Sequence, residues 1–342
     1  MKKLILSAFA FAITVGGAAA QNHNNEATLG QRGSQNEAFI EQVGAANRAV
    51  IGQGGGVFFE DEGHAEMNAA SQTQLGENLN AMVAQGVEQG EASGNTVSQY
   101  QTGSISEVLV DQGAGAGAVA RGNTASQTQA GSNNTGWVRQ GVHDGESTGN
   151  TAVQMQTGDM NFAGIAQGAY DAGAAGNVAE QTQEGVLNDA VIAQGTDLSR
   201  SEDNTARQMQ LGEGNTAHLE QGTFESSAAG NTAEQHQEGL NNSAEIYQGM
   251  EAGEALRNTA RQTQLGDDNA AVIDQGIGGS LAADNVAEQR QEGSGHTAYI
   301  LQGGFGAEAR DNHAFQHQSG QGHDAQIDQA GQGNTAGIRQ SN

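Results

Sequence analysis

Residues 177–195 read NVAEQTQEGVLNDAVIAQG, and near copies of this stretch recur along most of the chain. The first half has the form Asn-x-Ala-x-Gln-x-Gln-x-Gly, and its successive starts lie 27 residues apart in every step but one. These starts are Asn68, Asn95, Asn123, Asn150, Asn177, Asn204, Asn231, Asn258, Asn285 and Asn312. A fixed period of this size indicates stacked copies of one small unit, because a single unit cannot bury its inner face alone.

Each repeat has two halves in which particular residues recur at alternate positions. Asn204, Ala206 and Gln208 show this in a first half, and Asn188 and Ile192 belong to the alternating set of a second half. A period of two is typical of a β-strand. The sequence therefore predicts an all-β fold, a β-solenoid of about twelve stacked strand-turn-strand coils, with a variable surface loop closing each coil.

The recurring residues are expected to face inward, where many of them are amides. A buried amide is costly unless its donors and acceptors are satisfied, and identical amides stacked about 4.7–4.8 Å apart can bond one to the next. The amide ladder predicted here comprises Asn68, Gln72, Gln74, Gln85, Asn95, Gln112, Asn123, Gln140, Asn150, Gln167, Asn177, Gln194, Asn204, Gln208, Gln210, Gln221, Asn231, Gln248, Asn258, Gln275, Asn285, Gln302, Asn312 and Gln329.

The outward positions carry a charge pattern of their own. Three residues after successive first-half asparagines the residues are Glu180, Arg207, Glu234, Arg261 and Glu288. If the coils stack in register, opposite charges become vertical neighbours, which is mildly favourable. Duplication of a two-coil segment explains the same alternation equally well. Acidic residues also gather in the loops, where they either keep the surface soluble or bridge divalent cations; they include Asp61, Glu62, Asp144, Glu146, Glu202 and Asp203.

Residues 1–20 are typical of a signal peptide, with Lys2 and Lys3, an apolar run and three alanines before Gln21. The domain prediction is a signal peptide at 1–20 and one repeat domain at 21–342. The formal charge of −27 becomes about −29 without the two lysines, which makes nucleic acid an unlikely partner. The chain has no cysteine, and no second apolar stretch is long enough to span a membrane.

No group of residues predicts catalysis, so the chain is not expected to be an enzyme or to need a cofactor. His296 and His323 fall in the second-half asparagine column, where an imidazole can replace an amide; a metal site is the less favoured interpretation. Trp137 falls at an outward position.

The two ends of the repeat array are predicted to be polymerisation surfaces. Asn25 opens an unpaired second half, and Asn334 opens an unpaired first half followed only by Ser341 and Asn342. Uncapped strand edges pair with other chains, and a head-to-tail contact that does not close produces a filament. The residues assigned to these ends are Asn25, Ala27, Leu29 and Gln31, and Asn334, Ala336, Ile338 and Gln340.

The spaced Asn36, Ala38, Ile40, Gln42 and Gly44 resemble the curlin repeat of bacterial curli subunits, and the resemblance extends over residues 25–340. It implies a secreted structural subunit that assembles with itself into extracellular amyloid fibres of the biofilm matrix, where such fibres serve adhesion and aggregation. It also implies partners of the curli type, namely a secretion channel, a chaperone and a nucleator.

Two other functions are compatible with the repeat. One is a soluble monomeric β-solenoid that binds a flat surface or a polysaccharide through an outward threonine column, which comprises Thr96, Thr124, Thr151, Thr205, Thr232 and Thr259. The other is a minor nucleator of curli fibres rather than their main subunit. Fibres with a cross-β repeat would favour the amyloid interpretation, and a lasting monomer would favour the binder.

Overall fold

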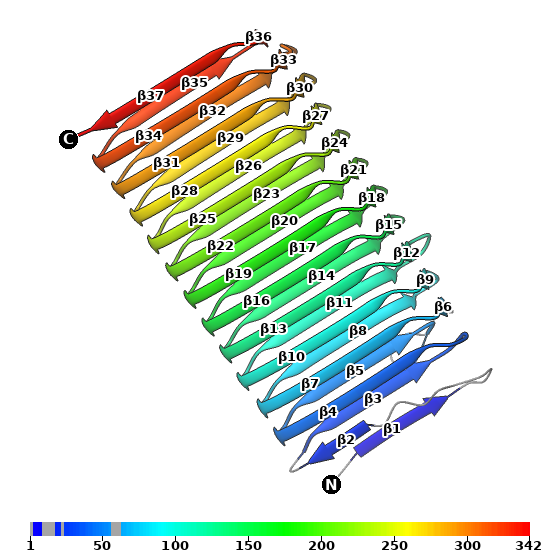
Figure 1. The fold of residues 1–342 in the computed structure, drawn as a ribbon. Helices are drawn as coiled ribbons and strands as arrows, with labels where there is room; N and C mark the ends of the chain where they lie inside the picture. The colour runs from blue at the N-terminus through cyan, green and yellow to red at the C-terminus, as the bar shows by residue number, and fades with distance from the viewer. Residues whose placement is uncertain (1–2, 9–17, 22–23, 56–62) are drawn as a thin grey trace. The chain divides into compact units, whose positions relative to one another are not determined.

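The computed structural model describes residues 3–8, 18–21, 24–55 and 63–342, and every regular element among them is a β-strand. The chain divides into two compact units, Met1–Gly176 and Asn177–Asn342. Each unit is a β-solenoid of parallel coils stacked one on the next, as expected from the repeat (Figure 1). In each unit the coils form three sheets: sheet A from second halves, sheet B from first halves and sheet C from short strands in the closing loops.

In unit 1 the strands of each sheet follow one another in chain order. Sheet A contains β1 (Lys3–Ala8), β3 (Glu26–Gln31), β5 (Arg48–Gln53), β8 (Asn80–Val87), β11 (Glu107–Ala114), β14 (Thr135–Val142) and β17 (Phe162–Ala169). Sheet B contains β2 (Ala18–Gln21), β4 (Glu37–Ala45), β7 (Ala69–Glu77), β10 (Thr96–Ser104), β13 (Thr124–Ser132) and β16 (Thr151–Asp159). Sheet C contains β6 (His64–Glu66), β9 (Glu91–Ser93), β12 (Val119–Arg121), β15 (Glu146–Thr148) and β18 (Gly173–Ala175).

Unit 2 repeats this arrangement. Its sheet A contains β20 (Asp189–Thr196), β23 (Thr216–Thr223), β26 (Ser243–Met250), β29 (Ala270–Ile277), β32 (Thr297–Gly304) and β35 (Asp324–Gln329). Its sheet B contains β19 (Val178–Val186), β22 (Thr205–Glu213), β25 (Thr232–Leu240), β28 (Thr259–Asp267), β31 (Val286–Ser294), β34 (His313–Gln321) and β37 (Thr335–Ser341). Its sheet C contains β21 (Arg200–Glu202), β24 (Ser227–Ala229), β27 (Glu254–Leu256), β30 (Leu281–Ala283), β33 (Ala309–Arg310) and β36 (Gly331–Gln332).

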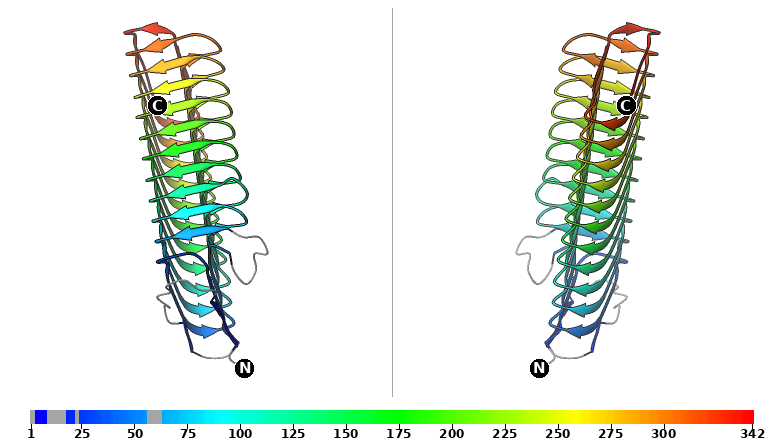
Figure 2. Two further views of the ribbon diagram at one scale, coloured as in Figure 1. Left: turned by 90° about the vertical axis from the view of Figure 1, so that its right-hand side faces the viewer. Right: turned by 90° about the vertical axis from the view of Figure 1, so that its left-hand side faces the viewer.

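The strands pair so that like residues meet like residues. Ala206 on β22 is the register partner of Ala233 on β25, and Gln221 on β23 is the partner of Gln248 on β26. Burial alternates along most strands of sheet B, as in β25, whose second, fourth and sixth residues are buried. The core of unit 2 therefore consists of vertical columns of buried residues, with alanine and glutamine on sheet B and alanine, Ile or Leu, and glutamine on sheet A. Within each unit, the strands of successive coils lie side by side in the views of Figure 2.

Sheet C is a feature that the repeat pattern did not reveal. Each closing loop was expected to be irregular, yet three residues of it pair with the loop of the next coil, as β24 pairs with β27. The middle residue of each strand points inward and is small; Ala228 and Ala255 are examples with at most 2 % exposure. The closing loops therefore build a third wall.

The turn between the two halves of a coil requires glycine for two separate reasons. Gly239 has a φ of 126°, and a Cβ atom there would lie 2.1 Å from the carbonyl oxygen of Gly266 in the next coil. The clash cannot be relieved without separating the coils, and the φ strain would remain even then.

We expect Gly239→Ala to lower the free energy of unfolding by about 3 kcal/mol, because it adds a backbone clash to an unfavourable φ. Gly295→Ala is the matched control. Gly295 lies in another turn of unit 2 with a φ of 66°, and nothing lies within 4 Å of its added Cβ. This control should cost about 1 kcal/mol. Denaturant titration of both variants measures the difference, and equal losses would show that coil spacing does not demand glycine at this turn.

Candidate functional site

A column of glutamine amides runs through sheet A of each unit. Gln221 Nε2 donates to Gln248 Oε1, and Gln248 Nε2 donates to Gln275 Oε1, both at 2.8 Å. The second hydrogen of Gln248 Nε2 faces the carbonyl oxygens of Thr232 and Asn258, each 3.5 Å away. Every side chain in this column is at most 7 % exposed. The column comprises Gln31, Gln53, Gln85, Gln112, Gln140 and Gln167 in unit 1, and Gln194, Gln221, Gln248, Gln275, Gln302 and Gln329 in unit 2.

Sheet B carries two further glutamine columns. Gln208 Nε2 donates to Gln235 Oε1, and Gln210 Nε2 donates to Gln237 Oε1, both at 2.9 Å. Each amide also donates to a carbonyl oxygen of a sheet A strand, as Gln210 does to Asp189 at 2.9 Å. In unit 1 Gln72 begins the first of these columns by bonding to Gln99, and Gln42 begins the second by donating to Gln74, which bonds in turn to Gln101. These bonds join the facing sheets as well as successive coils.

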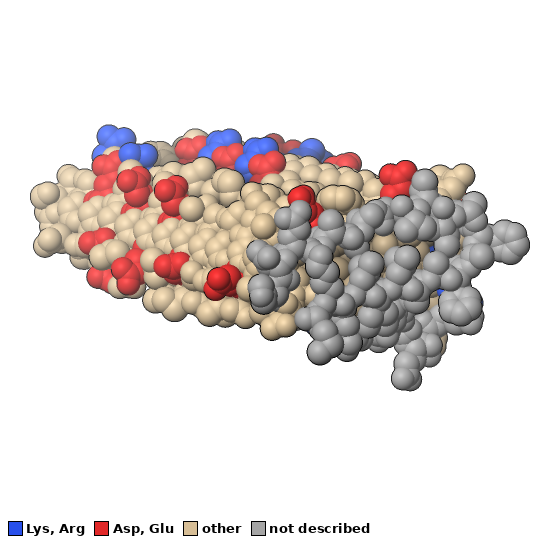
Figure 3. All heavy atoms as spheres, turned by 90° about the horizontal axis from the view of Figure 1, so that it is seen from below, with Lys and Arg blue, Asp and Glu red and all other residues tan. Residues whose placement is uncertain are grey.

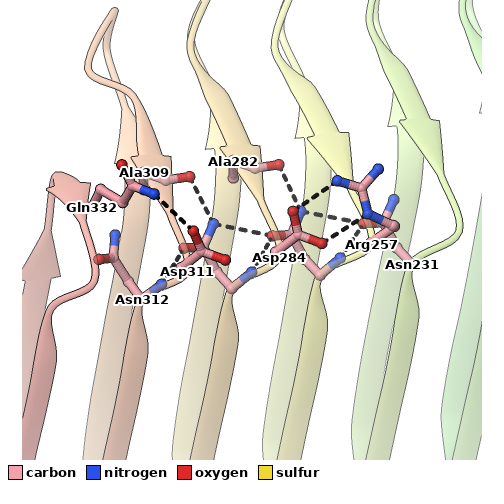
Figure 4. A network of polar contacts seen from close by, with 10 residues as sticks. Asn231, Arg257, Ala282, Asp284, Ala309, Asp311, Asn312 and Gln332 are labelled. Carbon is pink, nitrogen blue, oxygen red and sulfur yellow. Dashed lines mark hydrogen bonds and ion pairs between the residues drawn. The ribbon is translucent and has the colours of Figure 1, made fainter.

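Asparagine columns hold the corners where sheet C meets sheet B. Asn231 Nδ2 donates to Asn204 Oδ1 at 3.0 Å and to the carbonyl oxygen of Ala255 at 2.8 Å. The backbone N–H of Asn258 donates to Asn231 Oδ1 at 2.8 Å (Figure 4). The predicted corner residues are all at most 1 % exposed: Asn68, Asn95, Asn123 and Asn150 in unit 1, and Asn177, Asn204, Asn231, Asn258, Asn285 and Asn312 in unit 2.

The sequence pattern did not identify the hydroxyls that complete some of these corners. Ser201 Oγ donates to Asn177 Oδ1 at 3.2 Å, and it accepts from Asn204 Nδ2 at 2.8 Å. A small residue precedes every corner asparagine by three positions. This constant spacing is the sequence feature from which sheet C and these serines could have been predicted.

The outward charges of sheet B in unit 2 lie next to their opposites. Arg207 is 2.7 Å from Glu180 and 3.7 Å from Glu234, and Arg261 is 3.0 Å from Glu234 and 3.4 Å from Glu288. A second pair, Arg257 and Asp284, links adjacent turns (Figure 4). Along one margin of the face in Figure 3, basic groups lie beside acidic ones. Elsewhere on that face, acidic groups lie without a basic neighbour. Such exposed pairs contribute little individually.

His296 and His323 continue the second-half asparagine column near its end in unit 2. Their rings stack 5.2 Å apart with an angle of 2° between the planes. His296 Nε2 donates to the carbonyl oxygen of Glu292 at 3.1 Å, which leaves Nδ1 to accept the backbone N–H of His323 at 3.2 Å. The imidazole thus occupies both hydrogen-bonding positions of the amide that it replaces.

Trp137 lies on the outer side of β14. A Cβ atom added at Gly164 in the next coil would collide with the indole, so the ring covers that glycine. The ring of Phe162 approaches it edge to face at 6.5 Å, and the guanidinium of Arg139 lies 5.1 Å from its centroid.

Within the described residues, no cluster of three or more His, Cys, Asp or Glu side chains is arranged to hold a metal ion. Asp61 and Glu62 lie outside the described residues. The described part of the chain also contains no helix of the length and apolarity that crossing a membrane requires.

Two carboxyl groups are held in surroundings that disfavour their charge. Burial raises the pKa of Asp274 to about 6, and Glu245 and Glu251 act in the same direction, whereas the hydrogen bond from Tyr299, 2.6 Å from Asp274 Oδ2, opposes them. Burial likewise raises the pKa of Asp111 to about 6, against the charge of Arg139.

We therefore expect the repeat domain to be more stable at pH 5 than at pH 7. A carboxyl whose pKa is higher in the folded than in the unfolded protein stabilises the folded state increasingly as the pH falls from about 6 towards 4. This stabilisation is lost as the pH rises through 6. The hydrogen bond to Glu220 raises the pKa of His218, which acts in the same direction. The gain should be about 1–2 kcal/mol for each carboxyl. Denaturant titration of Asp274→Asn should show a smaller difference between the two pH values, and an unchanged difference would exclude Asp274 as a source.

The residues assigned to the polymerisation ends lie at the first and last strands of the array. Ala27, Leu29 and Gln31 lie on β3, directly after Asn25, and all four are buried. Asn334, Ala336, Ile338 and Gln340 lie before and along β37, where the inward residues are only half-buried.

The two edges differ in what covers them. β1 pairs with β3, and β2 pairs with β4, so two pieces of the expected signal segment lie on the N-terminal edge; residues 1–2 and 9–17 of that segment lie outside the described residues. Within the described residues, β35 and β37 have a strand on one side only. Their other backbone edge is therefore open to a further strand.

One comparison with known proteins matches the repeat in part of the chain. The family model described as "Curlin associated repeat" matches residues 23–55, the region that contains β3, β4 and β5. A search of curated protein sequences returned no match to the chain. Later coils repeat the inward asparagine, alanine and glutamine positions of the matched residues, which supports assignment to the curlin-repeat family.

Proposed function

We propose that the chain is a secreted structural subunit that joins head to tail into curli-like extracellular amyloid fibres. In this proposal residues 1–20 direct export and are removed, and residues 21–342 form the assembling domain. The fibres belong to the cell surface and biofilm matrix, where they support adhesion and aggregation. A curli-type secretion channel, a chaperone and a nucleator are the expected partners. The chain acts as a building unit rather than as an enzyme.

The observation that carries this proposal is the unfinished edge of the stack in unit 2. β35 and β37 present open backbone groups, and Gln329 and Gln340 on these strands end columns of amides that bond from coil to coil. A strand of another copy can continue both sheets without any change of register. Such addition repeats indefinitely, because each new copy brings the same open edge.

The position of the expected signal segment also supports the proposal. β1 and β2 occupy the outer side of β3 and β4, which is where β35 and β37 of another copy would pair. Cleavage before Gln21 would remove β1 and nearly all of β2. Export and exposure of the joining edge would then be linked in one step.

Seeded elongation of residues 21–342 tests the proposal. A variant that also lacks residues 22–33 loses the Asn25 half-coil, and we expect it to elongate at least about tenfold more slowly, because one open face is then mismatched. Elongation at the wild-type rate would contradict joining through these half-coils. If residues 21–342 stay monomeric and structured, the aligned threonines of sheet B would instead favour a surface-binding solenoid; Thr205, Thr232 and Thr259 are in register there.

A further inference from the structure

The glutamine column of sheet B that contains Gln72 in unit 1 begins with isoleucine, and the corresponding column of unit 2 ends with isoleucine. Ile40 on β4 is the register partner of Gln72, and Ile338 on β37 is the partner of Gln316. The interruption has a visible consequence, since Gln72 Oε1 is buried without a hydrogen-bond partner. An edge strand that carries isoleucine in this slot is therefore poorly matched to a strand that carries glutamine.

The neighbouring column ends in complementary hydrogen-bonding groups. Gln42 Nε2 donates to Gln74 Oε1 at 2.8 Å, but Gln42 Oε1 is buried and has no partner. At the other edge, Gln340 Oε1 accepts from Gln318 Nε2 at 3.0 Å, and Gln340 Nε2 donates to the carbonyl oxygen of Asp324 at 2.9 Å. An amide nitrogen has two hydrogens, so Gln340 retains one donor of the kind that Gln42 lacks.

We infer that β37 of one copy pairs in register with β4 of the next, with Ile338 on Ile40, Arg339 on Glu41 and Gln340 on Gln42. This inference rests on the proposed head-to-tail function and adds a register to it. The partner of the open edge is thus a specific strand of a second copy rather than any repeat.

The three sheet B contacts of this register are favourable, whereas other pairings of these residues would not be. Ile338 meets another isoleucine instead of an amide that would remain unpaired. Gln340 donates its remaining hydrogen to Gln42 Oε1, which continues the ladder across the joint. Arg339 and Glu41 are opposite charges at directly opposed outward positions.

The joint also includes one unfavourable neighbour. In sheet A the same register places Asp324 on β35 beside Glu26 on β3, where two carboxylates repel each other. Within the copy, Glu26 has Arg48 as its register partner on the other side. The Arg339–Glu41 contact is therefore the attractive outward charge pair of the joint, and it is the pair to manipulate.

Disulfide trapping tests the register directly, because the natural chain contains no cysteine. Directly opposed residues on neighbouring parallel strands lie about 4.8 Å apart, within the range that a disulfide spans. Residues 21–342 carrying Glu41→Cys and Arg339→Cys should form disulfide-linked chains when assembled fibres are oxidised. The control pairs Glu41→Cys with Thr335→Cys, four positions away along β37, and should remain unlinked. Equal linking in both variants would overturn the proposed register.

A charge-exchange cycle tests the energetics with the same protein. Arg339→Glu and Glu41→Arg should each slow seeded elongation about threefold, and the double variant should recover the wild-type rate. Arg121→Glu, which changes the net charge as Arg339→Glu does but lies in sheet C of unit 1, controls for charge alone. The inference fails if wild type elongates but the double variant shows no recovery. If wild type itself does not elongate, the proposed function fails, and the joint fails with it.

Discussion

Replacement of Gln248 by glutamate is expected to destabilise the repeat domain by about 3–5 kcal/mol at pH 7. Gln248 receives a hydrogen bond from Gln221 and gives one to Gln275, each at 2.8 Å, and its side chain is 0 % exposed. A carboxylate can keep the first bond, but it places a charged oxygen against the oxygen of Gln275. The penalty is that of a buried charge facing an acceptor.

The same substitution should be tolerated much better at pH 4. A protonated carboxyl has an O–H that can donate to Gln275 Oε1, so the ladder is restored when the glutamate is neutral. Denaturant titration at both pH values measures this recovery. Gln326→Glu, on the exposed side of β35, is the matched control and should change stability by less than about 0.5 kcal/mol. Equal losses for the two variants would contradict a buried, directional ladder.

Asn231→Ala is expected to destabilise the repeat domain by about 3 kcal/mol. The change removes the donor to the carbonyl oxygen of Ala255 and the acceptor for the backbone N–H of Asn258. Both backbone groups lie in the interior of the stack, where water cannot replace the lost amide. Each unpaired group then costs about 1–3 kcal/mol.

Thr232→Ala, one residue further along on the outer side of β25, is the control for this prediction. It removes a half-exposed side chain and should cost a few tenths of a kcal/mol. Hydrogen exchange of the Asn258 amide provides a local readout, because its protection should fall in Asn231→Ala. Unchanged protection would show that the corner amide does not hold the next coil in place.

Much of the fold was predictable because the repeat constrains it twice. Alternation along a strand determines which residues face inward, and the constant spacing between repeats determines which residues become neighbours. Ala206 and Ala233, or Gln221 and Gln248, could be paired from their places in the repeat alone. The alternating charges of Glu180, Arg207 and Glu234 became vertical neighbours for the same reason.

The third sheet could not be predicted from alternation, because its strands are too short. β21 has three residues, and a single inward position such as Ser201 gives no period. Only comparison between coils shows that a small residue recurs there. The interleaving of facing sheets was also inaccessible, since the pattern does not say that Gln210 donates to the carbonyl oxygen of Asp189.

The edges illustrate a different limit of the sequence pattern. The repeat identified Asn25 and Asn334 as the starts of unpaired halves, but it did not place residues 3–8 and 18–21 on the strands that follow Asn25 and Asn36. Nor did it show that Gln42 Oε1 is buried without a partner. Both features depend on three-dimensional neighbours that lie outside the repeat itself.

X-ray diffraction of aligned fibres grown from residues 21–342 tests the central claim most directly. Head-to-tail stacking of parallel coils predicts a sharp meridional reflection at about 4.7–4.8 Å, because every coil of every copy contributes the same strand spacing along the fibre. Fibres without this reflection, or a preparation that remains monomeric at concentrations that support seeding, would contradict the account.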